Sequence, residues 1–246
     1  MSLPVRVVRL SFEILWSTLR RGIRMRTLVN HVADAGAGSL FFIALTLGFV
    51  GVIGVYQTAE QMQKVIPEFS LLGAATIQLL VREFAPIITG LMVATKVGTG
   101  LAAEVGSMVV TDQVDAMRLC GVDPVDELVV PRVWGTVVAM VCLATLGGVV
   151  ALAAGIWVAW SGFDVPAETF LSLRFVKMPD LWVGLTKAGI FGFFIPVVSI
   201  ACGLEAKGGS DAVGEATTKA VVWSSFSVIL LDLVVGALAE VLGWTA

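Results

Sequence analysis

The sequence has few charged residues and a single histidine. Of its 246 residues, 14% are Asp, Glu, Lys or Arg, whereas an ordinary soluble domain has about 25%. This shortage excludes a disordered chain and a typical cytosolic enzyme. His31 and the widely separated Cys120, Cys142 and Cys202 indicate neither a disulfide framework nor a metal site. The net charge of −3 also argues against a nucleic-acid-binding protein, which usually needs a basic face.

Motifs for nucleotide binding and covalent catalysis are missing as well. The phosphate-binding pattern G-x-x-x-x-G-K-[ST] does not occur, so we expect that this chain does not itself hydrolyse ATP. Residues 98–103 match G-x-G-x-x-A, but they follow an apolar helix rather than a strand, which argues against a dinucleotide site. Because no Ser/His/Asp or Cys/His arrangement is recognisable, we predict a chain without an enzymatic site or a cofactor of its own.

Long apolar runs dominate the sequence. Hydrophobic residues make up 57% of the chain, and the mean hydropathy is +0.94. A membrane-spanning helix needs about 20 mostly apolar residues. The sequence therefore predicts an all-α integral membrane protein, with one domain over residues 1–246 and a spanning region at about 38–240. The five predicted spans are 40–56, 69–95, 133–163, 181–204 and 220–239.

The first residues, about 4–29, have the pattern of an amphipathic helix. Basic and polar residues recur at steps of three or four, opposite an apolar face. We predict a helix that lies in the membrane interface, where arginines suit an anionic leaflet. The alternative is a soluble helix packed on a cytosolic partner. The predicted membrane-surface residues are Arg6, Arg9, Arg20 and Arg24.

The distribution of Lys and Arg between the predicted loops predicts the orientation of the chain. With the N-terminus inside and the C-terminus outside, the outer segments hold only Lys64, Arg174 and Lys177. The inner segments hold eleven basic residues, which are Arg6, Arg9, Arg20, Arg21, Arg24, Arg26, Lys96, Arg118, Arg132, Lys207 and Lys219.

The inner loop at about 98–132 has the residue pattern of a compact helical element. Thr111 is placed to cap a short helix with Asp115 in its first turn, and Gly121 is placed to end it. Asp123 and Pro124 predict the start of a second helix. A loop of this length with its own secondary structure is often functional.

Small residues in the third predicted span recur four positions apart. Ala144 and Gly148 form one such pair, and Gly147, Ala151 and Gly155 continue the pattern. This spacing lets helix backbones approach closely. It predicts a tight helix interface, either within the subunit or between two copies.

Charged residues also occur within the predicted spans. Arg82 and Glu83 lie near the middle of the second span, where a charge costs about 3 kcal/mol and usually faces a partner or a wet cavity. Neighbours on a helix point about 100° apart, so we expect each to pair elsewhere, with Lys187, Lys219 or Asp232. The charges either line a lipid cavity or form a structural network, and Lys187 has the further alternative of extending to an interface.

Residues 82–135 and 203–240 closely resemble the MlaE/YrbE permeases, the membrane subunits of ABC transporters that work with MCE-domain proteins. The pattern AE-x-G-SM at 103–108 and the elements GVDP and VPR at 121–124 and 130–132 carry the resemblance, which covers about 57–240. It implies an interfacial N-terminal helix, five spans and a cytoplasmic coupling helix, in a homodimer within the bacterial inner membrane. It also implies charged residues at Arg82, Glu83, Lys219 and Asp232.

The resemblance further implies a mechanism. A separate ATPase subunit would bind ATP and Mg and dock on a coupling element at about 104–131, and an MCE-protein ring on the outer face would continue the lipid path. The cargo would be phospholipid; the alternatives are another hydrophobic cargo, such as a sterol or a fatty or mycolic acid, and a membrane scaffold without transport. The implied coupling residues are Glu104, Gly106, Ser107, Met108, Asp112, Gln113, Asp115, Met117, Gly121, Asp123 and Pro124.

Overall fold

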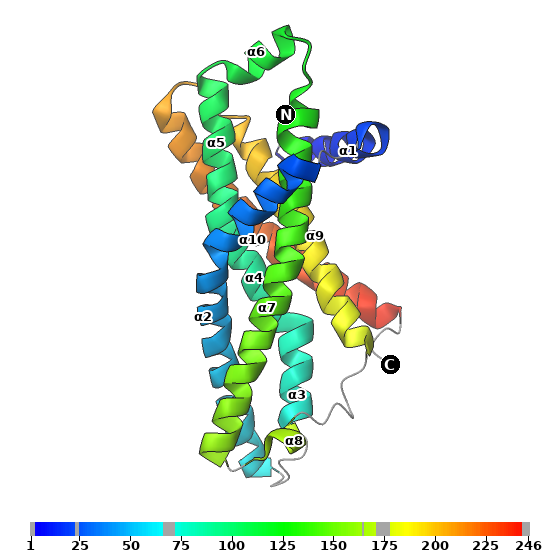
Figure 1. Cartoon of the computed structure of the whole chain (residues 1–246), viewed down its shortest axis with the longest axis vertical. Coiled ribbons are helices and arrows are strands. Elements are labelled where there is room, and N and C mark those ends of the chain that lie inside the picture. The colour runs from blue at the N-terminus through cyan, green and yellow to red at the C-terminus, as the bar shows by residue number, and fades with distance from the viewer. Residues whose placement is uncertain (1–2, 23–24, 66–71, 164, 171–177, 243–246) are drawn as a thin grey trace. The chain divides into compact units, whose positions relative to one another are not determined.

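The computed structural model describes residues 3–22, 25–65, 72–163, 165–170 and 178–242, and these ranges contain helices and turns but no strand. Figure 1 follows the chain from α1 to α10. The α-helices are α1 (Leu3–Arg21), α2 (Met25–Val65), α3 (Leu72–Leu79), α4 (Ala85–Val93), α5 (Thr99–Val110), α6 (Gln113–Leu119), α7 (Val130–Phe163), α8 (Ala167–Phe170), α9 (Met178–Gly203) and α10 (Ser210–Val241). Among the described residues, three short π-helices interrupt them, at η2 (Leu80–Phe84), η3 (Ala94–Gly98) and η4 (Val125–Val129).

The predicted all-α membrane fold is confirmed. Within the described ranges, five helical stretches are long and apolar enough to cross a membrane. They are Met25–Met62, Gly73–Val110, Val125–Phe163, Met178–Gly203 and Ser210–Val241. Pro196 lies inside α9, and a proline is tolerated there because neighbouring groups in a membrane bundle satisfy the freed carbonyl.

The predicted boundary of the N-terminal helix is wrong. The sequence pattern extends this helix to about residue 29, but α1 ends at Arg21 and α2 already begins at Met25. Gly22 has a φ of +73° and its N–H donates to the Thr18 carbonyl, 3.1 Å away. A glycine in this left-handed conformation commonly follows the last residue of a helix, and it separates the predicted interfacial helix from the first span.

Internal contacts group the chain into two compact units. The first unit comprises 1–39, 90–140 and 189–231, and the second comprises 40–89, 141–188 and 232–246. Helices α2, α4, α7, α9 and α10 each contribute residues to both units. The predicted single domain stays a prediction.

The core of the first unit includes one face of α1. Leu10 and Ile14 are buried with residues of α5, η4, α7 and α9. The opposite side of α1 leaves Val8, Phe12 and Leu19 at least two-thirds exposed. Since an exposed apolar stripe on a basic helix is typical of a helix in the membrane interface, this arrangement suits the predicted location of α1.

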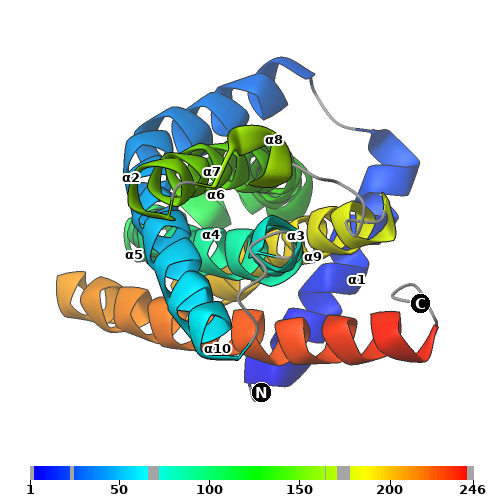
Figure 2. The ribbon, with the colours of Figure 1, turned by 90° about the horizontal axis from the view of Figure 1, so that it is seen from below.

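The second unit is built on close backbone contacts. Gly51 of α2 lies against the backbone of Ala151 in α7, and Gly147 and Gly155 of α7 lie against Leu47 and Val55 of α2. The predicted interface of small residues is therefore present within the subunit. The short α8 packs against α3 (Figures 1 and 2), and Gly73 lies directly on the backbone of Phe170.

Adding one methyl group at Gly51 is expected to destabilise the protein. A Cβ at this position would overlap the Ala151 carbonyl, and backbone does not yield as a flexible side chain does. We expect Gly51→Ala to lower the free energy of unfolding by about 1–3 kcal/mol. Gly54→Ala is the matched control, because a Cβ at Gly54 meets no atom within 4 Å. Thermal unfolding in detergent measures both, and equal stability of the two variants would contradict the close approach.

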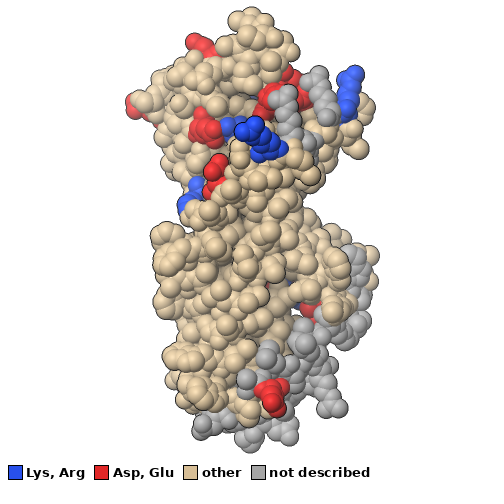
Figure 3. Space-filling model, in the orientation of Figure 1, with Lys and Arg blue, Asp and Glu red and all other residues tan. Residues whose placement is uncertain are grey.

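Charged side chains are unevenly distributed over the surface. On the face shown in Figure 3, Lys, Arg, Asp and Glu gather on the first unit, whereas almost all described atoms of the second unit belong to other residues. The exposed large hydrophobic residues of α2 in the second unit include Phe41, Phe42, Phe49 and Ile53. Apolar surface of this extent is typical of a protein in contact with lipid.

Candidate functional site

Two parts of the molecule carry the predicted functional residues: the coupling element (residues 104–131), in the first unit, and a group of charged residues in the second. Figure 1 shows that α6 joins α5 to the segment that precedes α7. The turn between α5 and α6 is tight, because Asp112 has a φ of 58°, the one left-handed non-glycine residue in the described chain. Asp is among the residues that tolerate this conformation.

The predicted start of the short helix is wrong, whereas its predicted end is confirmed. Thr111 does not cap α6; its hydroxyl donates to the Ser107 carbonyl and it terminates α5. The helix of the second span continues through α5 to Val110, although the sequence predicts a loop from about residue 98. Thr111 therefore follows the end of a helix and does not begin one. Gly121 follows α6 with a φ of +76°, as expected of a helix-ending glycine.

The second half of the coupling element begins as predicted. The Asp123 carboxylate accepts a hydrogen bond of 2.9 Å from the Val125 N–H, and Pro124 immediately precedes η4. A proline fits at the start of a helix because its missing N–H would have no helical partner there. The two halves of the element thus have separate helix starts and a defined turn between them.

An ion pair joins the helices on either side of this element. Arg132 of α7 is 7% exposed and donates through Nη2 to Oε1 of Glu104 on α5, over 2.5 Å. Its Nη1 donates to the Leu128 carbonyl, over 2.7 Å. Charge-assisted bonds of this kind are stronger than neutral ones. They hold the end of the second span to the start of the third, so the coupling element is anchored at both ends.

The side of α6 that faces away from the rest of the first unit is exposed and free to contact a partner. Leu119 is 90% exposed, and Asp115 and Arg118 form an exposed pair at 3.1 Å. Val114 points inward and is buried. Of the predicted coupling residues, Ser107, Asp112, Gln113 and Asp115 are exposed, Met108 and Met117 are half-buried, and Gly106 is buried against Ala206 and Val213.

Helix α1 is bound to the same region by polar contacts. The Ser17 hydroxyl donates to the Asp126 carboxylate of η4, and Trp134 Nε1 donates to the Thr18 hydroxyl over 2.9 Å. A surface pocket of about 370 Å³ lies between α1 and the coupling element. A displacement of the coupling element would therefore be transmitted to α1.

The four predicted membrane-surface arginines differ in their surroundings. Arg6 pairs with Glu205 at 2.8 Å, and Arg9 pairs with Glu13 one turn along α1 at 2.7 Å. Arg20 is exposed and lines the pocket beside α1. Arg24 lies outside the described residues. The membrane-surface role of all four stays a prediction.

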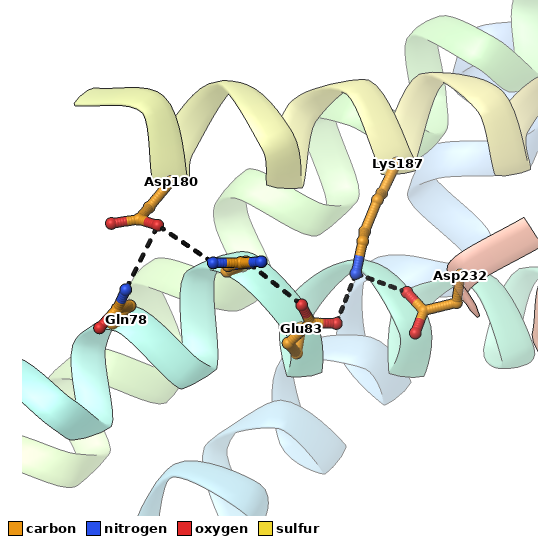
Figure 4. Close-up of polar contacts among 6 residues, drawn as sticks. Gln78, Glu83, Asp180, Lys187 and Asp232 are labelled. Atoms are coloured by element: carbon orange, nitrogen blue, oxygen red, sulfur yellow. Dashed lines mark hydrogen bonds and ion pairs between the residues drawn. The ribbon is translucent and has the colours of Figure 1, made fainter. Parts of the chain in front are cut away.

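In the second unit, several charged side chains contact one another in sequence across neighbouring helices (Figure 4). Lys187 of α9 has no exposed surface and contacts the carboxylates of Glu83 on η2 and Asp232 on α10, the latter at 2.9 Å. Arg82 contacts Glu83 at 3.3 Å and Asp180 at 3.8 Å. These five residues, with Gln78 bonded to Asp180, are called the buried charge network below.

Part of the predicted pairing is confirmed and part is wrong. Glu83 pairs with Lys187, as expected, whereas Asp232 contacts Lys187 and not Arg82 or Glu83. Arg82 and Glu83 also contact each other, contrary to prediction. The prediction assumed an α-helix, but both residues lie in the π-helix η2, whose wider turn changes the angle between neighbours. Because Lys187 is fully buried, it does not extend to an interface.

Lys219 does not belong to this network. Its ammonium pairs at 2.7 Å with Glu215, one turn earlier on α10, and its side chain is half exposed. Asp180 and Gln78 were missed by sequence reasoning. Asp180 stands at the predicted edge of the fourth span, where a carboxylate is ordinary, and Gln78 carries no charge to draw attention. The π-helix η2 was the other missing signal, and such segments are frequent at functional sites.

An apolar crevice lies beside the buried charge network. It has a volume of about 120 Å³ and is lined by residues of η2, α4, α7 and α9, among them Val81, Leu152 and Leu185. Gly184 lies against the backbone of Val81, so these helices approach closely at this point. Charges next to apolar surface are suited to a molecule that has both a polar group and a hydrocarbon part.

Comparison with known proteins shows the family. Residues 28–238 match the family model described as Permease MlaE. The chain belongs to the MlaE permease family. The match includes both the coupling element and every residue of the buried charge network. It shows that both features occur within the part of the chain that the family model describes.

Individual relatives in the MlaE family support the same assignment over most of the chain. The chain is 33% identical over 227 residues to a probable ABC transporter permease protein of Rickettsia felis, covering 92% of this chain and 87% of that protein. Probable ABC transporter permease proteins of Pyropia yezoensis and Synechocystis sp. are 30% and 31% identical, and the alignments cover 92% and 90% of this chain and 87% and 84% of those proteins.

Proposed function

We propose that this chain is the membrane subunit of an ATP-driven ABC transporter that moves phospholipid between the inner membrane and an MCE-protein conduit. The observation that carries the proposal is the coupling element, in which an exposed short helix is anchored at both ends by the Glu104–Arg132 pair. An element with two anchored ends transmits a rigid-body displacement to the spans. Membership of the MlaE permease family and the permease relatives support the same function.

Each implied partner has a place in the proposal. An ATPase subunit, which binds ATP and Mg, docks on the exposed face of α6, around Leu119 and Asp115. A second copy of this chain completes the transporter. The MCE protein binds at the outer ends of the spans. Within this scheme the buried charge network stabilises the helices around the lipid path or meets the lipid headgroup, and substitution of Asp232 separates these two roles.

The proposal is tested by purifying the complex from its native membrane in mild detergent and identifying its proteins and lipids by mass spectrometry. We expect an ATPase subunit, an MCE protein and phospholipid in stoichiometric amount. Leu119→Asp is expected to remove the ATPase subunit, whereas Met178→Asp, which changes another strongly exposed apolar side chain at the start of α9, is expected to leave it bound. Recovery of a homo-oligomer without partners, carrying only loosely bound lipid, would refute the proposal.

The proposed orientation places α6 on the cytoplasmic side. Cys120 is exposed at the end of α6, Cys142 lies on the third span and Cys202 is buried. In a Cys142→Ala, Cys202→Ala background, we expect a membrane-impermeant maleimide to label Cys120 in inverted vesicles and not in intact spheroplasts. Labelling of spheroplasts would contradict the orientation, and labelling after detergent solubilisation controls for reactivity of the thiol.

A further inference from the structure

A polar pocket lies in the first unit, and Glu104 is its one lining residue from the coupling element. Its volume is about 260 Å³, and residues of α2, η3, α5 and α7 line it. Its polar lining residues are His31, Asp34, Ser39, Lys96, Glu104, Arg132 and Thr136. All of these residues belong to helices that are long and apolar enough to span a membrane, where polar groups usually mark a ligand or a pathway.

Two of the four charged side chains around this pocket form an ion pair with each other, and the other two stand apart from that pair. Glu104 and Arg132 neutralise each other. Asp34 and Lys96 form no ion pair or side-chain hydrogen bond within the part of the chain that the structure describes. The pocket thus presents one cation and one anion that are each available to a ligand, with no excess of either sign.

Two further features indicate that the pocket is built for a ligand. The Ser39 hydroxyl lines it, is 2% exposed and has no hydrogen-bond partner in the described chain. A buried hydroxyl in this state costs free energy unless a ligand or a water satisfies it. Lys96 lies on the π-helix η3, and its ammonium rests against α2 at Gly38, where a Cβ would lie 2.9 Å from Nζ.

We propose that this pocket binds the headgroup of a zwitterionic phospholipid that carries a phosphate and a primary ammonium. Lys96 and the Ser39 hydroxyl contact the phosphate, and Asp34 accepts hydrogen bonds from the ammonium. A headgroup with phosphate alone would leave Asp34 unpaired next to a negative ligand. A quaternary ammonium has no N–H to donate, so Asp34 distinguishes the primary amine. The inference rests on the proposed function, since it names the headgroup class of a lipid cargo.

The size and position of the pocket favour a lipid headgroup over a whole lipid or a soluble metabolite. Pockets for drug-sized ligands measure roughly 300–1,000 Å³, and this one is smaller. Its apolar lining residues, Ala35, Val97 and Leu101, suit the glycerol region of a lipid. In the proposed orientation, Lys96 lies toward the cytoplasmic side, so the headgroup would come from the inner leaflet.

The test measures binding of short-chain lipids to the full chain in detergent by native mass spectrometry. The probes are dihexanoyl phosphatidylethanolamine, dihexanoyl phosphatidylcholine and dihexanoyl phosphatidylglycerol, with soluble phosphorylethanolamine as the headgroup alone. We expect phosphatidylethanolamine to bind most tightly. Loss of the charge-assisted contact in Lys96→Gln is expected to weaken it about tenfold, and Asp34→Asn is expected to remove the preference over the other two lipids.

A steric variant supplies a second line of evidence with a matched control. Gly100 lines the pocket and a Cβ there meets no atom within 4 Å, so Gly100→Leu is expected to fill the pocket and prevent binding. Gly36→Leu makes the same change on α2, also in open space but outside the lining, and is expected to bind as the unmodified chain does. Lys96→Gln changes an exposed side chain, so its thermal stability is expected to stay unchanged.

The outcomes separate this inference from the proposed function. Equal binding of the three lipids by the unmodified chain, or unaltered binding by Lys96→Gln and Gly100→Leu, would overturn the headgroup site even if the ATPase and MCE partners are recovered. Phosphorylethanolamine binding as tightly as the lipid would make the ligand a soluble one. Selective binding by a chain that recovers no partner would support the site and count against the transporter.

Discussion

Lys187→Met is expected to lower the free energy of unfolding by about 3 kcal/mol, because it removes a fully buried cation that contacts two partly exposed carboxylates. Lys187 has no exposed surface and contacts two carboxylates, those of Glu83 and Asp232. Methionine has the same number of side-chain atoms as lysine up to Cε but lacks the ammonium group, so both carboxylates lose this cation. Thermal or denaturant unfolding of the purified chain in detergent measures the loss.

Three comparison variants make this prediction specific. Lys219→Met removes a half-exposed lysine paired one turn away with Glu215, and it is expected to leave the free energy of unfolding almost unchanged, because solvent screens such a pair. Asp232→Asn leaves Lys187 paired with Glu83, so its cost is expected to be well below that of Lys187→Met. Adding Glu83→Gln to Lys187→Met is expected to restore part of the stability. If Lys187→Met were as stable as Lys219→Met, the buried charge network would have no stabilising role.

The same variants separate the two roles of the network. If it is structural, Asp232→Asn retains lipid transport in proportion to its stability. If it meets the lipid headgroup, Asp232→Asn changes transport or the bound lipid composition while the thermal stability stays near that of the unmodified chain. Measuring transport and stability on the same preparation therefore assigns the role.

The second large effect is expected at Arg132. Arg132→Met removes hydrogen bonds to Glu104 and to the Leu128 carbonyl from an almost fully buried guanidinium. Hydrogen bonds to charged groups contribute about 1.5–3 kcal/mol each, so we expect a loss of about 3 kcal/mol in the free energy of unfolding. In the assembled complex, we also expect less lipid moved for each ATP hydrolysed, since the coupling element loses the bond between its two ends.

Two controls accompany the Arg132 experiment. Arg118→Met removes the exposed Arg118–Asp115 pair on α6 and is expected to change the stability by no more than about 0.5 kcal/mol. Arg132→Lys keeps the charge but lacks the planar donor fork, so it is expected to recover only part of the stability. An Arg132→Met protein with unchanged stability and unchanged coupling would show that the Glu104–Arg132 pair does not anchor the element.

The long apolar runs made the five spans predictable, because no other structure buries so many consecutive hydrophobic residues. Gly121 and Asp123 were also predictable, since a local backbone requirement determines each of them. Helix boundaries next to the spans were harder to predict from the sequence. Gly22 ends α1 within a pattern that continues past it, and α5 extends beyond its apolar segment because helix geometry persists until another feature interrupts it.

The buried charge network could be predicted only in part. Charge within an apolar run identifies Arg82, Glu83, Lys187 and Asp232, because burial of a charge requires a partner. The contact between Arg82 and Glu83 depends on the π-helix η2, which has no recognised residue pattern. The polar pocket could not be predicted, because His31 and Asp34 of α2 come close to Lys96 of η3 only through the packing of helices that are far apart in the sequence.

The contacts of Glu83 have a consequence for biosynthesis. Its partner Lys187 follows it along the chain, and Asp232, the second carboxylate that contacts Lys187, lies near the C-terminus, so the buried charge network is complete only after the last helix has been made. When the ribosome delivers the second span to the membrane, neither of these residues exists. Arg82 does, and its contact with Glu83 lets the two charges of that span neutralise each other during insertion. The contact between Arg82 and Glu83 thus partly neutralises the charges of the nascent helix until Lys187 and Asp232 are translated.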